Sequence, residues 1–122
     1  FMAHWLDEEL GRRRYASSLL VIEELLADSP AEDHGLLTFY LGEAHRRRNV
    51  TGDRAKAAEL YARAITLPGA PDATWREHGF ALRSAGRNAE AAAALHHYLQ
   101  LAPQAEDRAF VQRALETTGE RP

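Results

Sequence analysis

Histidine is the residue type in this chain best suited to bind a metal or to move a proton near neutral pH, and six occur. His96 and His97 are neighbours. Neighbouring residues of a helix point about 100° apart, so the two rings cannot easily share one metal ion. No H-E-x-x-H motif occurs, and no acidic residue lies one helical turn from the pair. We therefore predict that both are ordinary surface or half-buried residues, and we expect neither a metal nor a cofactor.

Nucleophiles and phosphate-binding loops are the next candidates for chemistry, and none has the sequence context that it needs. Ser17, Ser18 and Ser84 lack the G-x-S-x-G surroundings of a nucleophile elbow, and the chain has no cysteine. The segment "LPGAP" lacks the glycine spacing and the lysine of a phosphate-binding loop. The sequence therefore predicts no catalytic residue and a protein that is not an enzyme by itself.

Composition and charge limit the kinds of partner. The net charge of −3 lacks the basic excess typical of nucleic-acid-binding domains. The "RRR" runs at 12–14 and 46–48 each wrap around an expected helix, close in sequence to acidic residues, which indicates solvated, partly paired charge. No apolar run reaches the roughly 18 residues that cross a membrane, so no membrane insertion is expected. We expect a soluble protein of the bacterial cytoplasm or periplasm, and the start "FMAHW" indicates a piece of a longer protein.

The elements that would position any binding residue are helices. Ala, Leu, Glu and Arg dominate the chain, and glycine or proline residues interrupt it at regular intervals. Between these breakers the apolar residues recur at helical spacing. The expected helices cover residues 3–10, 12–28, 35–48, 53–67, 72–85, 88–101 and 104–117. Asp72 and Asn88 are expected to cap helix starts, and Gly86 is expected to end a helix.

An internal repeat becomes visible when Gly42 is aligned with Gly79. These glycines are 37 positions apart, and the spacing falls to 34 when the three extra residues "NVT" at 49–51 are removed from the first copy. Glycine within a helix costs about 1 kcal/mol relative to alanine, so both positions indicate that another helix passes too close for a Cβ atom. The residues expected to form the core around them are Leu41, Leu60, Tyr61, Leu67, Trp75, Leu95, Tyr98 and Leu101.

A period of 34 residues with two helices per repeat resembles the tetratricopeptide repeat (TPR). The second copy matches the TPR pattern at Trp75, Gly79, Ala91, Leu95 and Pro103, and the first copy at Leu41, Gly42, Ala57 and Tyr61. The resemblance implies an all-α, right-handed α-solenoid of antiparallel helix hairpins, with six or seven helices in a single domain. Its parts would be a partial unit (1–34), a full repeat with a three-residue turn insertion (35–71), a full repeat (72–105), and a capping helix and tail (106–122).

In TPR proteins the first helix of each repeat lines a concave groove that binds peptides. The resemblance therefore implies groove residues on two helices of this chain: Phe39, Glu43, Arg46, Arg47, Arg76, Phe80 and Arg83. Aromatic and arginine side chains are enriched at binding hot spots. The alternative is that the neighbouring helix or the N-terminal segment covers Phe39 and Phe80, and that the arginines are an ordinary helix surface.

Three functions follow from this resemblance. The first is a non-catalytic module that binds a peptide or protein segment in its groove. The second is an accessory tail of a larger bacterial enzyme, because "HHYLQLAPQAEDRAFVQRAL" resembles the ends of TPR tails, including those of zinc metallopeptidases. The third is self-association into a homodimer through the open end of the solenoid.

Overall fold

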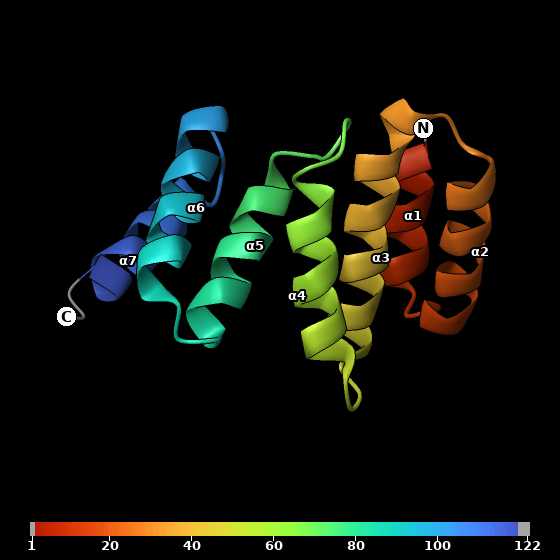
Figure 1. The fold of residues 1–122 in the computed structure, drawn as a ribbon, viewed down its shortest axis with the longest axis horizontal. Helices are drawn as coiled ribbons and strands as arrows, with labels where there is room; N and C mark the ends of the chain where they lie inside the picture. Colours follow the sequence, from red (N-terminus) through yellow and green to blue (C-terminus); the bar gives the residue numbers. More distant parts are fainter. Residues whose placement is uncertain (1, 120–122) are drawn as a thin grey trace. The chain divides into compact units, whose positions relative to one another are not determined.

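The computed structural model describes residues 2–119, which are helical apart from turns and contain no strand. Phe1 and residues 120–122, the end of the expected tail, lie outside the described residues. The helices are α1 (Met2–Gly11), α2 (Tyr15–Asp28), α3 (His34–Arg48), α4 (Asp53–Ala64), α5 (Ala73–Ser84), α6 (Asn88–Leu101) and α7 (Arg108–Gly119), with a short 3₁₀ turn, η1 (Ala31–Asp33), before α3 (Figure 1). The predicted all-α fold is confirmed, and within each of the chain's two compact units consecutive helices pack on one another, which is consistent with a helical repeat.

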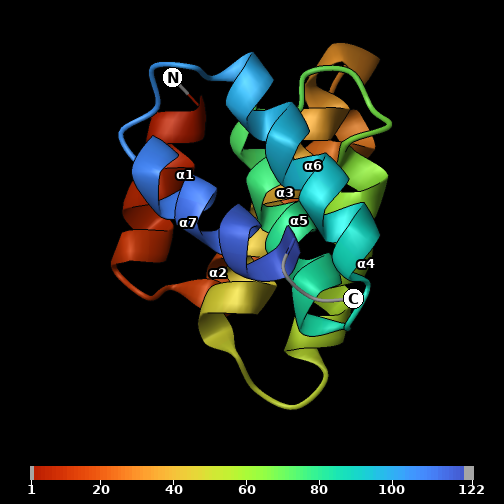
Figure 2. The same cartoon turned by 90° about the vertical axis from the view of Figure 1, so that its left-hand side faces the viewer.

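The chain forms two compact units, residues 1–71 (unit 1) and residues 72–122 (unit 2). The boundary falls where the sequence pattern separates the two full repeats. In unit 1, α3 packs against α4 on one side and α2 on the other, and α1 contacts both α2 and α3 (Figure 1). In unit 2, α6 packs against α5 and also against α7 (Figure 2).

Each unit has its own apolar core. In unit 1 the fully buried side chains come from all four helices and include Leu6, Leu10, Ile22, Leu37, Leu60 and Tyr61. In unit 2 one core cluster joins α6 to α7 and consists of Leu95, Tyr98, Leu99, Val111 and Ala114, with Trp75 and Phe80 packed against it. A smaller cluster of Leu82, Ala91 and Ala94 joins α5 to α6. Leu101 was expected in the core of unit 2 but is 43% exposed, because it is the last residue of α6 and the chain turns away after it.

Both expected close approaches at glycine are confirmed. A Cβ atom on Gly42 would lie 2.8 Å from Cε1 of Tyr61, and one on Gly79 would lie 2.7 Å from Cδ2 of Leu95. Gly42 and Tyr61 belong to the hairpin α3–α4, whereas Gly79 and Leu95 belong to the hairpin α5–α6. The two hairpins therefore use the same packing device: a glycine on the first helix receives a large side chain from the second.

Alanine at position 42 is expected to destabilise the protein by about 1 kcal/mol. A helix gains about 1 kcal/mol when glycine becomes alanine, but overpacking a filled core costs about 1–3 kcal/mol. The Tyr61 ring cannot move aside easily because it is buried and its hydroxyl is bonded to Glu43. Urea denaturation would measure the change. Gly11→Ala is the matched control, since nothing lies within 4 Å of its Cβ position, and it should be neutral or slightly stabilising. Equal effects at both positions would contradict the packing argument.

Some helix ends agree with the predictions made from the sequence, and others differ from them. Gly86 has a φ of 80° and ends α5 as predicted. Its amide bonds the carbonyl of Arg83, and the Arg87 amide bonds that of Leu82, which is the Schellman arrangement. The predicted side-chain caps are wrong, because Asp72 makes no capping hydrogen bond and Asn88 lies inside α6.

Two predicted helix starts are also wrong. The segment 12–28 begins its helix only at Tyr15, because Arg12, Arg13 and Arg14 form a turn in which Arg13 has a φ of 61°. The "RRR" run at 12–14 therefore does not wrap around a helix. The last helix begins at Arg108 instead of residue 104, because the residues before it form turns closed by bonds such as Ala105 N–H to Ala102 O.

Candidate functional site

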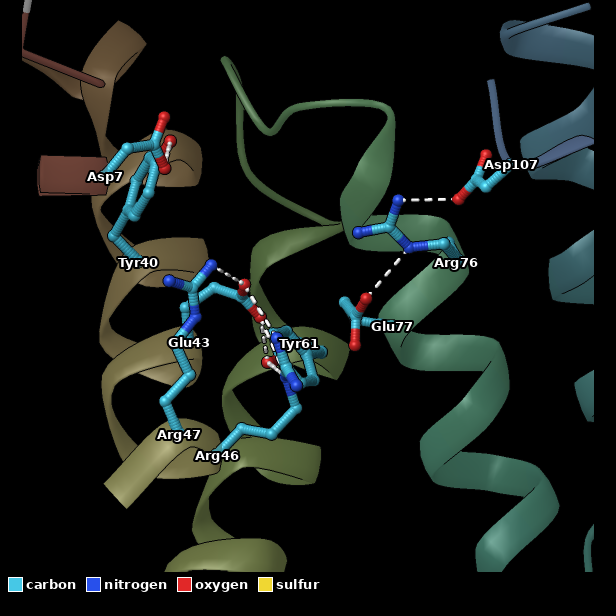
Figure 3. A network of polar contacts seen from close by, with 9 residues as sticks. All are labelled: Asp7, Tyr40, Glu43, Arg46, Arg47, Tyr61, Arg76, Glu77 and Asp107. Atoms are coloured by element: carbon cyan, nitrogen blue, oxygen red, sulfur yellow. Dashed lines mark hydrogen bonds and ion pairs between the residues drawn. The ribbon is translucent and has the colours of Figure 1, made fainter. Parts of the chain in front are cut away.

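The seven predicted groove residues lie on two helices, one in each unit. Phe39, Glu43, Arg46 and Arg47 are on α3 of unit 1, and Arg76, Phe80 and Arg83 are on α5 of unit 2. Within each unit the structure brings most of them into contact with other side chains instead of leaving them free. The polar residues belong to two clusters, which Figure 3 shows, and the two phenylalanines make ring contacts with neighbouring aromatic side chains.

Phe39 is a core residue of unit 1. Its side chain is 5% exposed. The ring packs edge-to-face on Tyr40, with centroids 5.1 Å apart, and lies tilted against Tyr61 at 6.0 Å. Tyr40 is itself held by a hydrogen bond from its hydroxyl to Asp7 of α1, at 2.9 Å. Of the two alternatives for Phe39, the covered one holds, and this ring offers no surface to a ligand.

Glu43 is the centre of a buried polar cluster on α3 and α4. Its side chain is 4% exposed. Arg46 donates Nε–H to Oε2 (3.1 Å) and Nη2–H to Oε1 (3.0 Å), forming a two-pronged pair. Arg47 donates to Oε1 at 3.2 Å, and the hydroxyl of Tyr61 donates to Oε2 at 2.5 Å. Figure 3 shows the three side chains converging on this carboxylate.

The electrostatics of this cluster keep Glu43 ionised. Burial by itself raises the pKa of Glu43, but the hydrogen bonds from Arg46 and Tyr61 and the charges of Arg46 and Arg47 outweigh burial and lower it. Both carboxylate oxygens are already occupied by donors, so Glu43 is poorly placed to bind a ligand or to act as a base. Its role is to fix two arginines whose side chains remain 45% and 33% exposed.

A second carboxylate cluster, which the sequence did not reveal, closes the turn between α3 and α4. Asp53, the first residue of α4, is buried. Arg48 donates to its two oxygens at 2.8 Å each, the Val50 amide donates at 3.0 Å, and His45 Nδ1 donates at 2.9 Å. The bonds from Arg48 and His45 lower the pKa of Asp53. The sequence feature that could have indicated this cluster is an aspartate at the start of a helix, just after the three-residue turn insertion.

On α5 of unit 2, Arg76 is also engaged by its neighbours. It donates Nε–H to Glu77 at 2.9 Å and Nη1–H to Asp107 at 2.9 Å, and its guanidinium lies 5.7 Å from the ring centre of Tyr98. The Tyr98 hydroxyl donates to the other oxygen of Asp107 at 2.6 Å. Burial raises the pKa of Asp107, but these bonds outweigh it and lower that pKa. Arg76 thus helps to fix the turn that precedes α7.

The two remaining α5 candidates differ from each other. Phe80 is half-buried against the unit 2 core, and its ring lies 5.8 Å from that of Phe110 on α7. Arg83 is half-exposed and forms no hydrogen bond or ion pair with any residue that the structure describes. Arg83 is therefore the candidate whose charge is most available to a partner.

The histidines do not form a joint site. His96 is exposed, and the His97 ring packs edge-to-face on Trp75 with centroids 4.2 Å apart. His78 is half-buried, and burial together with the charge of Arg87 lowers its pKa. Over residues 2–119, no group of three or more His, Cys, Asp or Glu side chains is arranged to hold a metal ion.

Comparisons with known protein families and with curated proteins give no significant match to this chain. Within the described part of the chain, no helix has the length and apolar character to cross a membrane. Any functional assignment therefore rests on the residues of the chain itself.

Proposed function

We propose that this chain is a TPR-like interaction module, a right-handed α-solenoid that binds a peptide or protein segment and performs no chemistry of its own. The equivalent glycine contacts in the two hairpins support a repeat. Gly42 and Gly79 correspond in the sequence alignment, and so do Tyr61 and Leu95. The occupied carboxylates of Glu43 and Asp53 support a structural role for the buried acids instead of a catalytic one.

The partner that this proposal favours is an acidic segment. The first helices α3 and α5 carry arginines near their C-terminal ends, and three of them keep part of their guanidinium side chains at the surface: Arg46, Arg47 and Arg83. Arginine binds carboxylates through two parallel hydrogen bonds and loses little entropy when its position is already fixed. Glu43 fixes Arg46 and Arg47 in this way. Arg83, on α5, has no hydrogen-bond or ion-pair partner among the described residues, and this available charge is the observation that carries the proposal.

Arg83→Ala is expected to weaken the binding of an acidic peptide by about five- to tenfold, which is about 1 kcal/mol. The probe is a set of fluorescein-labelled dodecapeptides that are rich in Glu and Asp, neutral, or rich in Lys, and binding is followed by fluorescence anisotropy. Arg83 forms no hydrogen bond or ion pair with a described residue, so its removal should leave helicity and melting nearly unchanged.

Arg54→Ala is the matched control, because Arg54 is an exposed arginine on α4. It should leave the affinity within about twofold of wild type. If no acidic peptide binds, the proposed partner class is wrong. If Arg54→Ala weakens binding as much as Arg83→Ala, the attraction is only general charge, and a specific site is excluded.

A further inference from the structure

An open depression of about 640 Å³ lies in unit 2 between α6 and α7, and none of the residues assigned to peptide binding lines it. Its apolar part is formed by Leu99 on α6, Pro103 in the turn and Leu115 on α7. Leu99 is buried and Leu115 is half-buried within the unit. The apolar part of the depression therefore continues the core of unit 2, and the depression itself is open to solvent.

Along this depression, α7 carries a positive charge and a negative charge at equal distances from a central polar residue. Arg108, Gln112 and Glu116 line it at intervals of four residues, so they follow one another along a single face of the helix. Arg108 donates only a long, 3.5 Å hydrogen bond to the Pro103 carbonyl. Neither Arg108 nor Glu116 forms an ion pair with another described residue of the chain.

We propose that this depression binds the α7 helix of a second copy of the chain, in an antiparallel arrangement about a twofold axis that passes near Gln112. A helix rises about 1.5 Å per residue, so Arg108 and Glu116 lie about 6 Å on either side of that axis. Antiparallel pairing then places Arg108 of each copy opposite Glu116 of the other. The Gln112 side chains meet at the axis, where one amide can donate to the other.

This complementarity is what selects a second copy over an unrelated partner. In a twofold interface the same patch must complement itself, and a cation and an anion equidistant from a polar centre satisfy that condition. Pairing of the two α7 helices would also cover Leu115 in both copies. A single helix pair is smaller than the interfaces of about 1,200–2,000 Å² that hold stable complexes, so the dimer is expected to be weak and dependent on concentration.

Sedimentation velocity between about 10 and 500 µM tests the proposal by charge reversal. The wild-type chain should shift towards the dimer over this range. Arg108→Glu and Glu116→Arg should each weaken dimerisation at least about tenfold, because each sets like charges opposite one another across the interface. The double variant Arg108→Glu/Glu116→Arg restores opposite charges at both positions and should dimerise within about threefold of wild type.

Arg113→Glu is the matched control, since Arg113 is an exposed α7 residue outside the depression, and it should dimerise as the wild type does. Circular dichroism of every variant establishes that α7 is still folded. A wild-type chain that stays monomeric at the highest concentration overturns the proposal. So does a dimer that is indifferent to the single reversals, and so does a double variant that fails to recover. These outcomes are independent of the acidic-peptide test, which uses α5.

Discussion

Replacing Phe39 with alanine is expected to lower the free energy of unfolding by about 3–5 kcal/mol. The ring is 5% exposed and contacts both Tyr40 and Tyr61, so its removal leaves a cavity in the core of unit 1 and ends two aromatic contacts. Urea denaturation followed by circular dichroism measures the change. A loss of this size is a large part of the stability of a small domain.

Phe110→Ala provides the matched control, because Phe110 is the same residue type but 63% exposed. It should cost less than about 1 kcal/mol. If the two variants were equally stable, Phe39 would not be a core residue. The comparison also matters for function: a loss of partner binding in Phe39→Ala would reflect unfolding, whereas the same loss in Arg83→Ala at unchanged stability would reflect a lost contact.

Glu43→Gln is expected to destabilise the protein by about 2–3 kcal/mol at neutral pH. The substitution keeps the shape but removes the negative charge that faces Arg46 and Arg47, and it places an amide where Tyr61 and two guanidiniums all donate. The value lies below that for a fully buried ion pair because both arginines remain in contact with solvent. Urea denaturation of both proteins at pH 7 gives the difference.

The pH dependence of this difference provides a second measurement. The pKa of Glu43 is lowered in the folded protein, so its contribution to stability is fully present above the ordinary value of 4.5 and is lost as the pH falls through the folded pKa. The gap between wild type and Glu43→Gln should therefore narrow as the pH is lowered to about 3. Glu59→Gln removes the same charge from an exposed residue and should cause no measurable change at any pH. A gap that stays constant with pH would contradict the role of the carboxylate charge.

The helices and the glycine contacts could be predicted because their signals are local or repeated. Glycine and proline interrupt the chain at nearly every helix end, and the alignment of Gly42 with Gly79 predicts the close helix approach that both hairpins contain. Because the chain contains two copies of the repeat, one copy could be compared with the other, as two related sequences are compared in an alignment. The start of α7 was predicted wrongly because the turn before it is fixed by tertiary contacts. Asp107, in that turn, accepts hydrogen bonds from Arg76 on α5 and Tyr98 on α6.

The candidate site was less predictable, because the repeat pattern gives the face of a helix but not what covers it. The repeat pattern predicts that Phe39 faces a groove. The ring is instead buried, because Tyr40 and Tyr61 pack around it. Glu43 was predicted to be a groove residue, but Arg46 and Arg47 of its own helix and the Tyr61 hydroxyl from α4 occupy both of its carboxylate oxygens. Both outcomes require the three-dimensional arrangement of α3 against α4, which no spacing along one helix contains.

The turn between α3 and α4 bears on how this chain can be engineered. Residues 49–52 are exposed, so they look like a natural place to insert an epitope tag or a fused domain. Tolerance to insertion depends instead on the hydrogen bonding of the backbone involved. Here Asp53 holds the Val50 amide and Arg48 from the far side of the turn, and both Asn49 and Gly52 have positive φ angles. Added residues would separate Asp53 from these donors, so the turn is a poor insertion site although its side chains face water.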